Sequence, residues 1–355
     1  MLKPVDLQPG DRSGADPDST DPNFINDWQP HDIVLRDAWF PLAHDISVGN
    51  RPLYRSIYSQ PYYVWRENGE AVASEFPPAD ETGQEGSLLT GGTGRYPVTE
   101  CYGYVWGWYG DPANADVKYL PNIPFFPPQG GLPRYMKGTV RFNCTSALTL
   151  ENLIDLTHAD ILHANLIGDE KSESEEIEVI TTSETVTMIR HCKNKSVAPA
   201  MRWLGGVKAK TQDVRQVIHI YVRNHIALIY GRFTPGYDVP VLHTSLPESR
   251  DRTRQDVGFN LTNARGLFKY IFPTVGNWVA MQDMYMTTPQ SSRYDGPTSR
   301  RDLHSRFDKG GQEYRRLMKE LAARQAAGDF AYREDGIPSR DCSELLGIEP
   351  GLYKF

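Results

Sequence analysis

A stretch rich in proline and glycine, residues 111–134, divides the chain into two parts of different texture. Before it, the segments 32–43, 62–70 and 95–112 are rich in aromatic and β-branched residues, which favour strands. The second of these segments ends on an Asn-Gly turn, and residues 75–94 predict a polar, Gly-rich loop. After it, strand-like segments alternate with helical patterns. Because proline interrupts both helices and sheets, residues 111–134 predict an extended connector between a first domain of strands and a second, α+β domain.

The second part carries clear patterns for both kinds of element. Residues 176–192 and 214–233 each predict a hairpin, because two strand-like runs flank a short polar turn. Residues 314–326 carry apolar side chains at helical spacing, and residues 149–165 also read as one helix. The pattern predicts an antiparallel sheet with helices.

Composition limits the possible function classes. The 355 residues suffice for one large or two modest domains, and 39% of them are hydrophobic. The net charge of −7 comes without long blocks of one sign, which argues against nucleic acid as the main partner. Four scattered cysteines indicate a reducing compartment, and no apolar run suggests a leader or a membrane span. We therefore expect a cytoplasmic protein that begins with a flexible polar arm, residues 1–24.

The segment 151–163, ENLIDLTHADILH, concentrates costly polar groups among apolar residues. His158 and His163 are five residues apart and would point about 140° apart on an ideal helix. They can share a ligand only if the helix widens, as in a π-bulge, or breaks between them. Asp155 lies on the same helical face as His158 and could accept a hydrogen bond from a ring nitrogen. With one distant carboxylate, two histidines make a set that holds Fe(II) and leaves positions open for O2 and substrate.

The spacing alone does not distinguish a metal site from ordinary packed histidines. Isolated histidines elsewhere are interpreted as structural, namely His44, His191, His219, His225, His243 and His304.

The pattern N-L-I-D-L-T-H-A-D-I-L-H resembles the iron-binding segment of Rieske-type non-haem iron oxygenases, N-x-x-D-x-x-H-x-x-x-x-H. The resemblance implies that His158 and His163 are iron ligands. It also implies that Asp155 couples the iron to its electron donor and that Asn152 lies close behind the ligands.

The region 277–318 is similar to the downstream part of the same family, in its phthalate-oxygenase and demethylase branch. Its Gln-Asp pair implies Asp283 as the third ligand. Trp278, five residues earlier, is expected either to line the substrate pocket or to belong to the core. The resemblance implies an α+β architecture, with a degenerate all-β Rieske-like domain at 25–134 and a START-like helix-grip catalytic domain at 135–355.

The chain departs from this family in one respect. The first domain normally binds a [2Fe–2S] cluster through Cys-x-His and Cys-x-x-His, and this sequence contains neither half. Residues 71–94, where both halves should fall, contain no cysteine and no histidine. The cluster loops are interpreted as deleted, so electrons must come from elsewhere.

Three alternatives follow. A separate [2Fe–2S] protein, or a homologous subunit that carries a Rieske cluster, docks and supplies electrons. Otherwise the chain is a silent or structural partner subunit, or its site runs chemistry that needs no reductase. The first predicts an Fe(II) oxygenase component, within a trimer or hetero-oligomer, that hydroxylates or oxidatively demethylates a small aromatic or heterocyclic substrate with O2.

Overall fold

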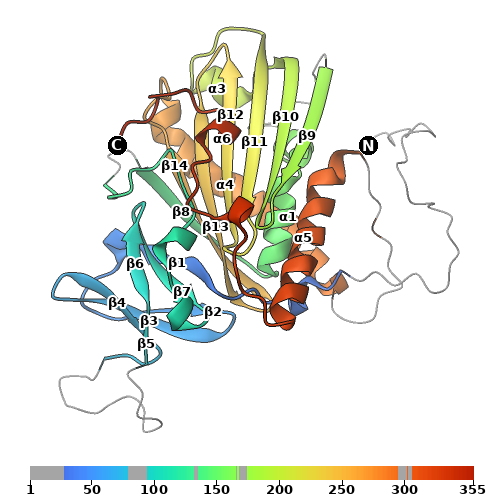
Figure 1. The fold of residues 1–355 in the computed structure, drawn as a ribbon. Helices are drawn as coiled ribbons and strands as arrows, with labels where there is room; N and C mark the ends of the chain where they lie inside the picture. The colour runs from blue at the N-terminus through green and yellow to red at the C-terminus, as the bar shows by residue number, and fades with distance from the viewer. Residues whose placement is uncertain are drawn as a thin grey trace, which may run out of the picture.

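The computed structural model describes residues 28–78, 94–131, 135–164, 166–167, 174–294, 302 and 306–355. Two small antiparallel sheets come first, followed by one large antiparallel sheet with helices (Figure 1). This α+β arrangement confirms the predicted fold class. The predicted arm, residues 1–24, lies outside the described residues, and so does most of the predicted loop 75–94.

The N-terminal part contains two small sheets. The first has the order β1-β7-β6 and the second the order β2-β3-β4-β5. The strands are β1 (Ala38–His44), β2 (Leu53–Ile57), β3 (Gln60–Glu67), β4 (Glu70–Ser74), β5 (Arg95–Tyr96), β6 (Val98–Cys101) and β7 (Tyr104–Tyr109).

Aromatic and branched side chains from both small sheets form one core. Phe40, Tyr62 and Val105 are fully buried within it. The turn between β3 and β4 is the predicted Asn-Gly pair, and Asn68 and Gly69 both have positive φ, as a two-residue hairpin turn requires.

The large sheet has the order β8-β14-β13-β12-β11-β10-β9. Its hairpins β9–β10 and β11–β12 confirm the two predicted from sequence. The strands are β8 (Tyr135–Phe142), β9 (Ser174–Thr181), β10 (Thr185–Ser196), β11 (Thr211–Tyr221), β12 (Ile226–Thr234), β13 (Val239–Ser249) and β14 (Arg252–Asn260).

Helices cover one face of this sheet (Figure 1). The side chains of Ile218 and Ile220 on β11, and of Val222 directly after it, face the same side and pack in the core that α1 and α5 share. α4 lies against β8. The helices are α1 (Ser146–Ile154), α2 (His158–Leu162), α3 (Pro199–Trp203), α4 (Phe268–Ser291), α5 (Lys309–Ala326) and α6 (Ser343–Leu346).

The opposite face of the sheet receives the first domain and the C-terminal segment. Val217 and Tyr221 of β11 pack there with Trp106 and Leu346. The connector is more ordered than predicted: instead of running extended, it forms two 3-10 turns and buries Phe125, because its apolar residues complete this core.

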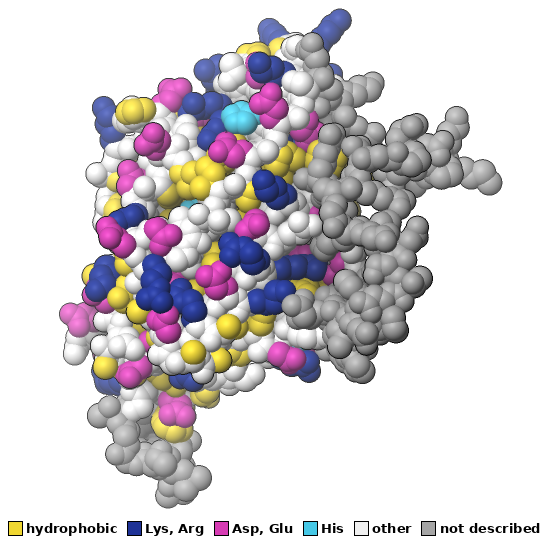
Figure 2. All heavy atoms as spheres, turned by 45° about the vertical axis from the view of Figure 1, so that its right-hand side comes forward, with side chains coloured by type: hydrophobic (Ala, Val, Ile, Leu, Met, Phe, Trp, Pro, Cys, Tyr) yellow, Lys and Arg dark blue, Asp and Glu magenta, His cyan; other side chains and the backbone are white. Residues whose placement is uncertain are grey.

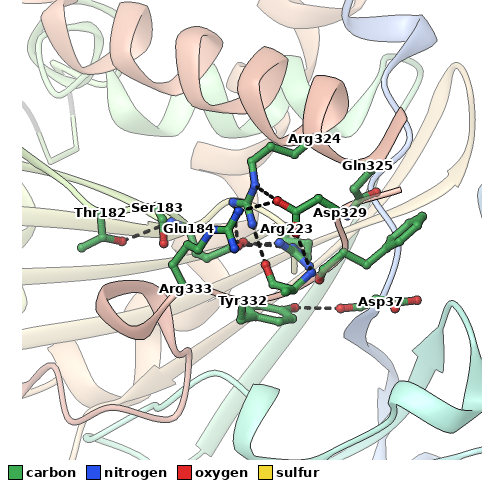
Figure 3. Close-up of polar contacts among 12 residues, drawn as sticks. Asp37, Thr182, Ser183, Glu184, Arg223, Arg324, Gln325, Asp329, Tyr332 and Arg333 are labelled. Carbon is green, nitrogen blue, oxygen red and sulfur yellow. Dashed lines mark hydrogen bonds and ion pairs between the residues drawn. The ribbon is translucent and has the colours of Figure 1, made fainter. Parts of the chain in front are cut away.

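A buried polar network fastens the C-terminal segment to the hairpin ends of the sheet (Figure 3). Arg223 forms two hydrogen bonds with Glu184, of 2.5 and 2.9 Å, and stacks 3.9 Å above the ring of Tyr332. The Tyr332 hydroxyl donates to the carbonyl of Asp37 at 2.8 Å. The network therefore links both domains to the chain end.

The structure corrects one boundary and leaves others open. The predicted strand 32–43 begins only at Ala38, because a 3-10 turn, Pro30–Asp32, precedes it. The domain limits stay a prediction, although the chain passes to the large sheet at β8. Lys, Arg, Asp and Glu side chains are interspersed over the face in Figure 2. Among the described helices, none has both the length and the apolar character that crossing a membrane requires.

Candidate metal centre

The segment 149–165 is not one helix, as predicted, but two helices with a break. α1 ends at Ile154 and α2 begins at His158. The Asp155 carboxylate accepts hydrogen bonds from the Thr157 amide at 2.9 Å and its hydroxyl at 2.6 Å, a local turn that competes with helix continuation. The break thus lies before His158, and His163 follows the end of α2, so no π-bulge is needed.

This break brings the two histidines together with a carboxylate from α4. Asp283 Oδ1 lies 3.4 Å from His158 Nε2 and 3.1 Å from His163 Nε2. Within the described residues, these three side chains form the group whose ligand atoms lie within 4.8 Å of one another. The arrangement can hold one metal ion.

Hydrogen bonds orient both imidazoles toward the common point. His158 Nδ1 donates to the backbone carbonyl of Asp155, and His163 Nδ1 donates to Gln282 Oε1 at 2.8 Å. With the ring proton on Nδ1, each Nε2 can offer its lone pair to a metal, as histidine ligands usually require. When no metal is bound, a protonated ring donates from Nε2 to Asp283 instead. The expected hydrogen bond from a histidine to the Asp155 carboxylate is wrong: the carbonyl of Asp155 serves instead.

The electrostatics of the site favour an ionised carboxylate. Burial alone would raise the pKa of Asp283, but hydrogen bonds from His158 and His163 outweigh burial and hold the pKa well below its usual range. Burial would likewise lower the pKa of His158, but Asp283 outweighs it and raises that pKa. The site therefore concentrates one negative charge between two imidazoles, which suits a divalent cation.

The ligands open onto a cavity between α4 and the sheet. Its walls are mostly apolar, with Ile218, Val241, Phe259 and Phe272 as examples. Gly276 lets α4 approach the sheet closely, since a Cβ there would meet the Phe259 ring at 2.8 Å. The cavity offers an apolar space beside His158, His163 and Asp283.

Two polar side chains interrupt this apolar wall, Gln216 on β11 and His243 on β13. Within the described protein, neither Gln216 Oε1 nor His243 Nδ1 has a hydrogen-bond partner. Burial lowers the pKa of His243 to about 4, so the ring is neutral at pH 7. Sequence reasoning interpreted His243 as structural; the available signal was a histidine two residues after Val241 on an otherwise apolar strand.

A family model, the vanillate O-demethylase oxygenase C-terminal domain, matches residues 142–324, more than half of the chain. The chain belongs to this family. It is therefore a catalytic subunit of the Rieske-type oxygenases, an oxidoreductase, as the sequence resemblance implied. The match includes His158, His163 and Asp283.

Known relatives agree with this membership. A vanillate O-demethylase oxygenase subunit from Pseudomonas sp. (strain HR199) is 23% identical over 347 residues, which are 83% of this chain and 97% of the relative. A dicamba monooxygenase structure with 3,6-dichlorosalicylic acid has a TM-score of 0.66 at 20% identity and covers 83% of this chain and 99% of its own. The Pseudomonas putida CBB5 protein NdmA with caffeine has a TM-score of 0.59 at 14% identity, with 83% and 93% coverage.

On the outer side of the oxygenase site, a second, open and more polar cleft contains the remaining predicted residues. Asn152 and Asp155 line it together with His158, Ile161 and Met286. His158 lines both the cleft and the cavity, so it lies between them.

The structure does not bring Trp278 into the cavity. Its side chain lies on the outer face of α4 and is 70% exposed, and it is not among the described residues that line either space. The expectation that Trp278 lines the pocket is therefore wrong for this chain. The reason is helical phase, because Gly276, Val279, Ala280 and Asp283 occupy the inner face of α4.

Proposed function

We propose that this chain is the mononuclear Fe(II) component of an oxygenase that hydroxylates or oxidatively demethylates a small aromatic or heterocyclic substrate with O2. The observation that carries the proposal is the convergence of His158, His163 and Asp283 at the wall of an apolar cavity. Two imidazoles and one carboxylate suit Fe(II) and leave positions open for O2 and substrate. Ferrous iron, when bound, supplies the oxygen activation that no side chain can provide.

The protein's own part is orientation and exclusion of water. The Asp155 carbonyl and Gln282 hold the Nδ1 protons, so that both imidazoles present Nε2. The lowered pKa of Asp283 keeps its buried carboxylate ionised, so it contributes a negative charge to the site. The apolar lining keeps water from competing with substrate.

The cavity wall supports a flat, mostly apolar substrate with at least one polar substituent. A ring would lie among the apolar side chains while the substituent binds His243 Nδ1 or Gln216 Oε1, the two atoms without partners. If the oxidised carbon is a methyl group on oxygen or nitrogen, the hydroxylated product loses formaldehyde. One O2, two electrons and two protons then yield the demethylated product, formaldehyde and water.

The two electrons must come from another protein, since the sequence lacks the Cys-x-His and Cys-x-x-His ligands of a Rieske cluster. A [2Fe–2S] partner would dock at the outer cleft, where Asp155 and Asn152 lie beside His158. The partner is a ferredoxin-type protein or a homologous subunit with its own cluster, in a trimer or hetero-oligomer. The convergence of all three ligands disfavours the alternative of a silent subunit.

The test is O2 consumption and formaldehyde release by the Fe(II)-loaded chain with a purified [2Fe–2S] donor and its reductase. Vanillate, dicamba and caffeine are the probes. We expect substrate-dependent turnover only when the donor is present. Donor-independent turnover would contradict the electron route.

Asp155→Asn sharpens this test because an asparagine oxygen still accepts from Thr157 and preserves the turn. The variant should keep its iron and lose most donor-dependent turnover. Thr157→Val is the control: it disturbs the turn but leaves the carboxylate. Equal rates for Asp155→Asn and the unmodified chain would remove Asp155 from the route.

A further inference from the structure

The short helix α2 is anchored by charge and not by apolar packing. Of its five residues, the buried one is Asp160. Its neighbour Ile161 is 74% exposed. Yet α2 carries His158 at its start and leads directly into His163. The position of both imidazoles therefore depends on what holds Asp160.

Two cations of β10 hold this carboxylate. Arg190 Nη2 lies 2.5 Å and Lys195 Nζ lies 2.6 Å from Asp160 Oδ2. Arg190 also donates through Nη1 to the carbonyl of Leu156 at 2.9 Å. Its Nε donates to Glu175 at 2.6 Å, so the buried cluster is electrically balanced.

The irregular backbone of β10 places Arg190 and Lys195 on the same side of the strand, where both contact α2. Arg190 and Lys195 are an odd number of residues apart and would face opposite sides of a regular strand. The register between β10 and β11 shifts between Cys192 and Lys195, and Asn194 has a φ of +49°. Such a bulge re-aims the following side chain. As a result Lys195 is buried on the same side as Arg190.

Arg190 contacts the chain on both sides of His158. Arg190 binds the backbone two residues before His158 and the side chain two residues after it. The segment 156–160 is thereby fixed to β10, a strand paired on both sides in the large sheet, while Asp283 comes from α4. A metal site needs its ligands held close to the binding geometry by their supporting contacts.

We propose that Asp160, Arg190 and Lys195 are positioning residues of the metal site, which hold α2 so that His158 and His163 face Asp283. The inference rests on the proposed function, because it concerns the same metal. These residues do not contact the metal or the substrate. Their loss frees α2 to move relative to α4 and weakens metal binding.

The test is an anaerobic titration with Co(II), whose visible absorption reports both affinity and ligand geometry. We expect Asp160→Asn and Arg190→Met to bind Co(II) roughly 10-fold or more weakly, the range seen when supporting contacts of metal ligands are removed. Their Co(II) spectra should also change. Lys195→Met leaves Arg190 in place and should weaken binding by a few-fold only, and Lys195→Arg should restore it.

Glu184→Gln is the matched control. Glu184 immediately precedes β10, and its pair with Arg223 is as deeply buried, but it fastens the C-terminal segment and not α2 (Figure 3). It should lower the thermal stability of the apo chain yet leave Co(II) affinity and spectrum unchanged. This control separates loss of a buried ion pair from loss of ligand positioning.

The outcomes are distinct. An unmodified chain that binds no Co(II) overturns the proposed function and this inference with it. A chain that binds Co(II) normally, with Asp160→Asn and Lys195→Met both indistinguishable from Glu184→Gln in affinity and spectrum, overturns this inference alone. If Asp160→Asn does not fold, the milder Lys195→Met decides by the same comparison.

Discussion

The two domains of this oxygenase differ in what their buried polar groups do. In the small sheets, buried groups satisfy local backbone, as when the Tyr62 hydroxyl donates to the Trp108 carbonyl at 2.8 Å and Arg55 donates to the Leu42 carbonyl at 2.8 Å. In the large domain, Nε2 of His158 and His163 and the unpartnered Nδ1 of His243 face a metal position or a cavity.

The difference teaches that the first domain supports the second through packing. The first domain covers one face of the large sheet, and Asn224 donates to the Trp39 carbonyl across the boundary at 3.0 Å. Removing this cover would expose apolar surface of the sheet at a cost of about 25 cal/mol per Å2. The first domain thus supports the large sheet by packing, whereas the second domain contains the candidate metal site.

Removal of a ligand from the second domain has the largest expected effect. Asp283→Ala should weaken Fe(II) binding by more than about 100-fold, since even supporting contacts of metal ligands change affinity by about 10- to 100-fold. Cys101→Ser, in the first domain, should keep full affinity. Anaerobic Fe(II) titration measures both, and retained affinity in Asp283→Ala would break the comparison.

Low pH should destabilise the second domain by protonating His219, a buried histidine that is neutral in the folded chain. Burial lowers the pKa of His219 to about 4, and its Nδ1 lies 2.8 Å from the Thr187 hydroxyl. Below pH 6.5 the unfolded chain binds a proton that the folded chain does not bind until about pH 4. The free energy of unfolding is therefore full above pH 6.5 and falls by roughly 3 kcal/mol as the pH drops through 4.

His219→Gln should reduce this pH dependence by the share of His219 and leave the share of His225 and His243, whose pKa values burial also lowers, to about 3 and about 4. Urea unfolding at pH 7.5 and 4.5, followed by circular dichroism, measures the effect. The same slope in the variant and the unmodified chain would show that another group controls acid unfolding.

Substrate binding should respond to the polar atoms of the cavity. His243→Leu keeps an apolar wall but removes Nδ1, so KM for a polar aromatic substrate should rise about 10-fold, the worth of one buried hydrogen bond. Iron content should not change. Val241→Ala, on the same strand, is the control for altered shape. An unchanged KM in His243→Leu would remove this residue from substrate recognition.

The smallest effect concerns the boundary between the domains. Asn224→Ala leaves the buried Trp39 carbonyl without its donor and should lower the free energy of unfolding by about 1 kcal/mol. Iron affinity should stay the same, because Asn224 and Trp39 lie outside the group of His158, His163 and Asp283. A parallel loss of iron would show that the two roles are not separate.

Local sequence signals predicted much of the fold. The hairpins β9–β10 and β11–β12 and the turn at Asn68 could be predicted because alternation and turn residues act over a few positions. The break at Asp155 could not, since a carboxylate that caps its own turn competes with an equally good helical pattern. Which face of α4 turns toward the cavity, and therefore where Trp278 points, depends on tertiary packing. A short stretch of sequence does not contain that information.

The site was predicted unevenly for the same reason. The spacing of His158 and His163 and a distant Asp283 suggested a triad only through a family resemblance. The partners Gln282 and Arg190 lie far from the histidines in sequence. Gln282 becomes a neighbour through the packing of α4, and Arg190 through the position of β10 in the sheet. Supporting residues are therefore the part of a metal site that sequence reasoning is most prone to miss.

The central claim is that one domain holds a single iron while the other holds no cluster. The most direct measurement is iron and acid-labile sulfide per chain after anaerobic reconstitution with Fe(II) and sulfide. The account predicts one iron per chain and no sulfide. A chain without iron, or with about three irons and two sulfides, would contradict it.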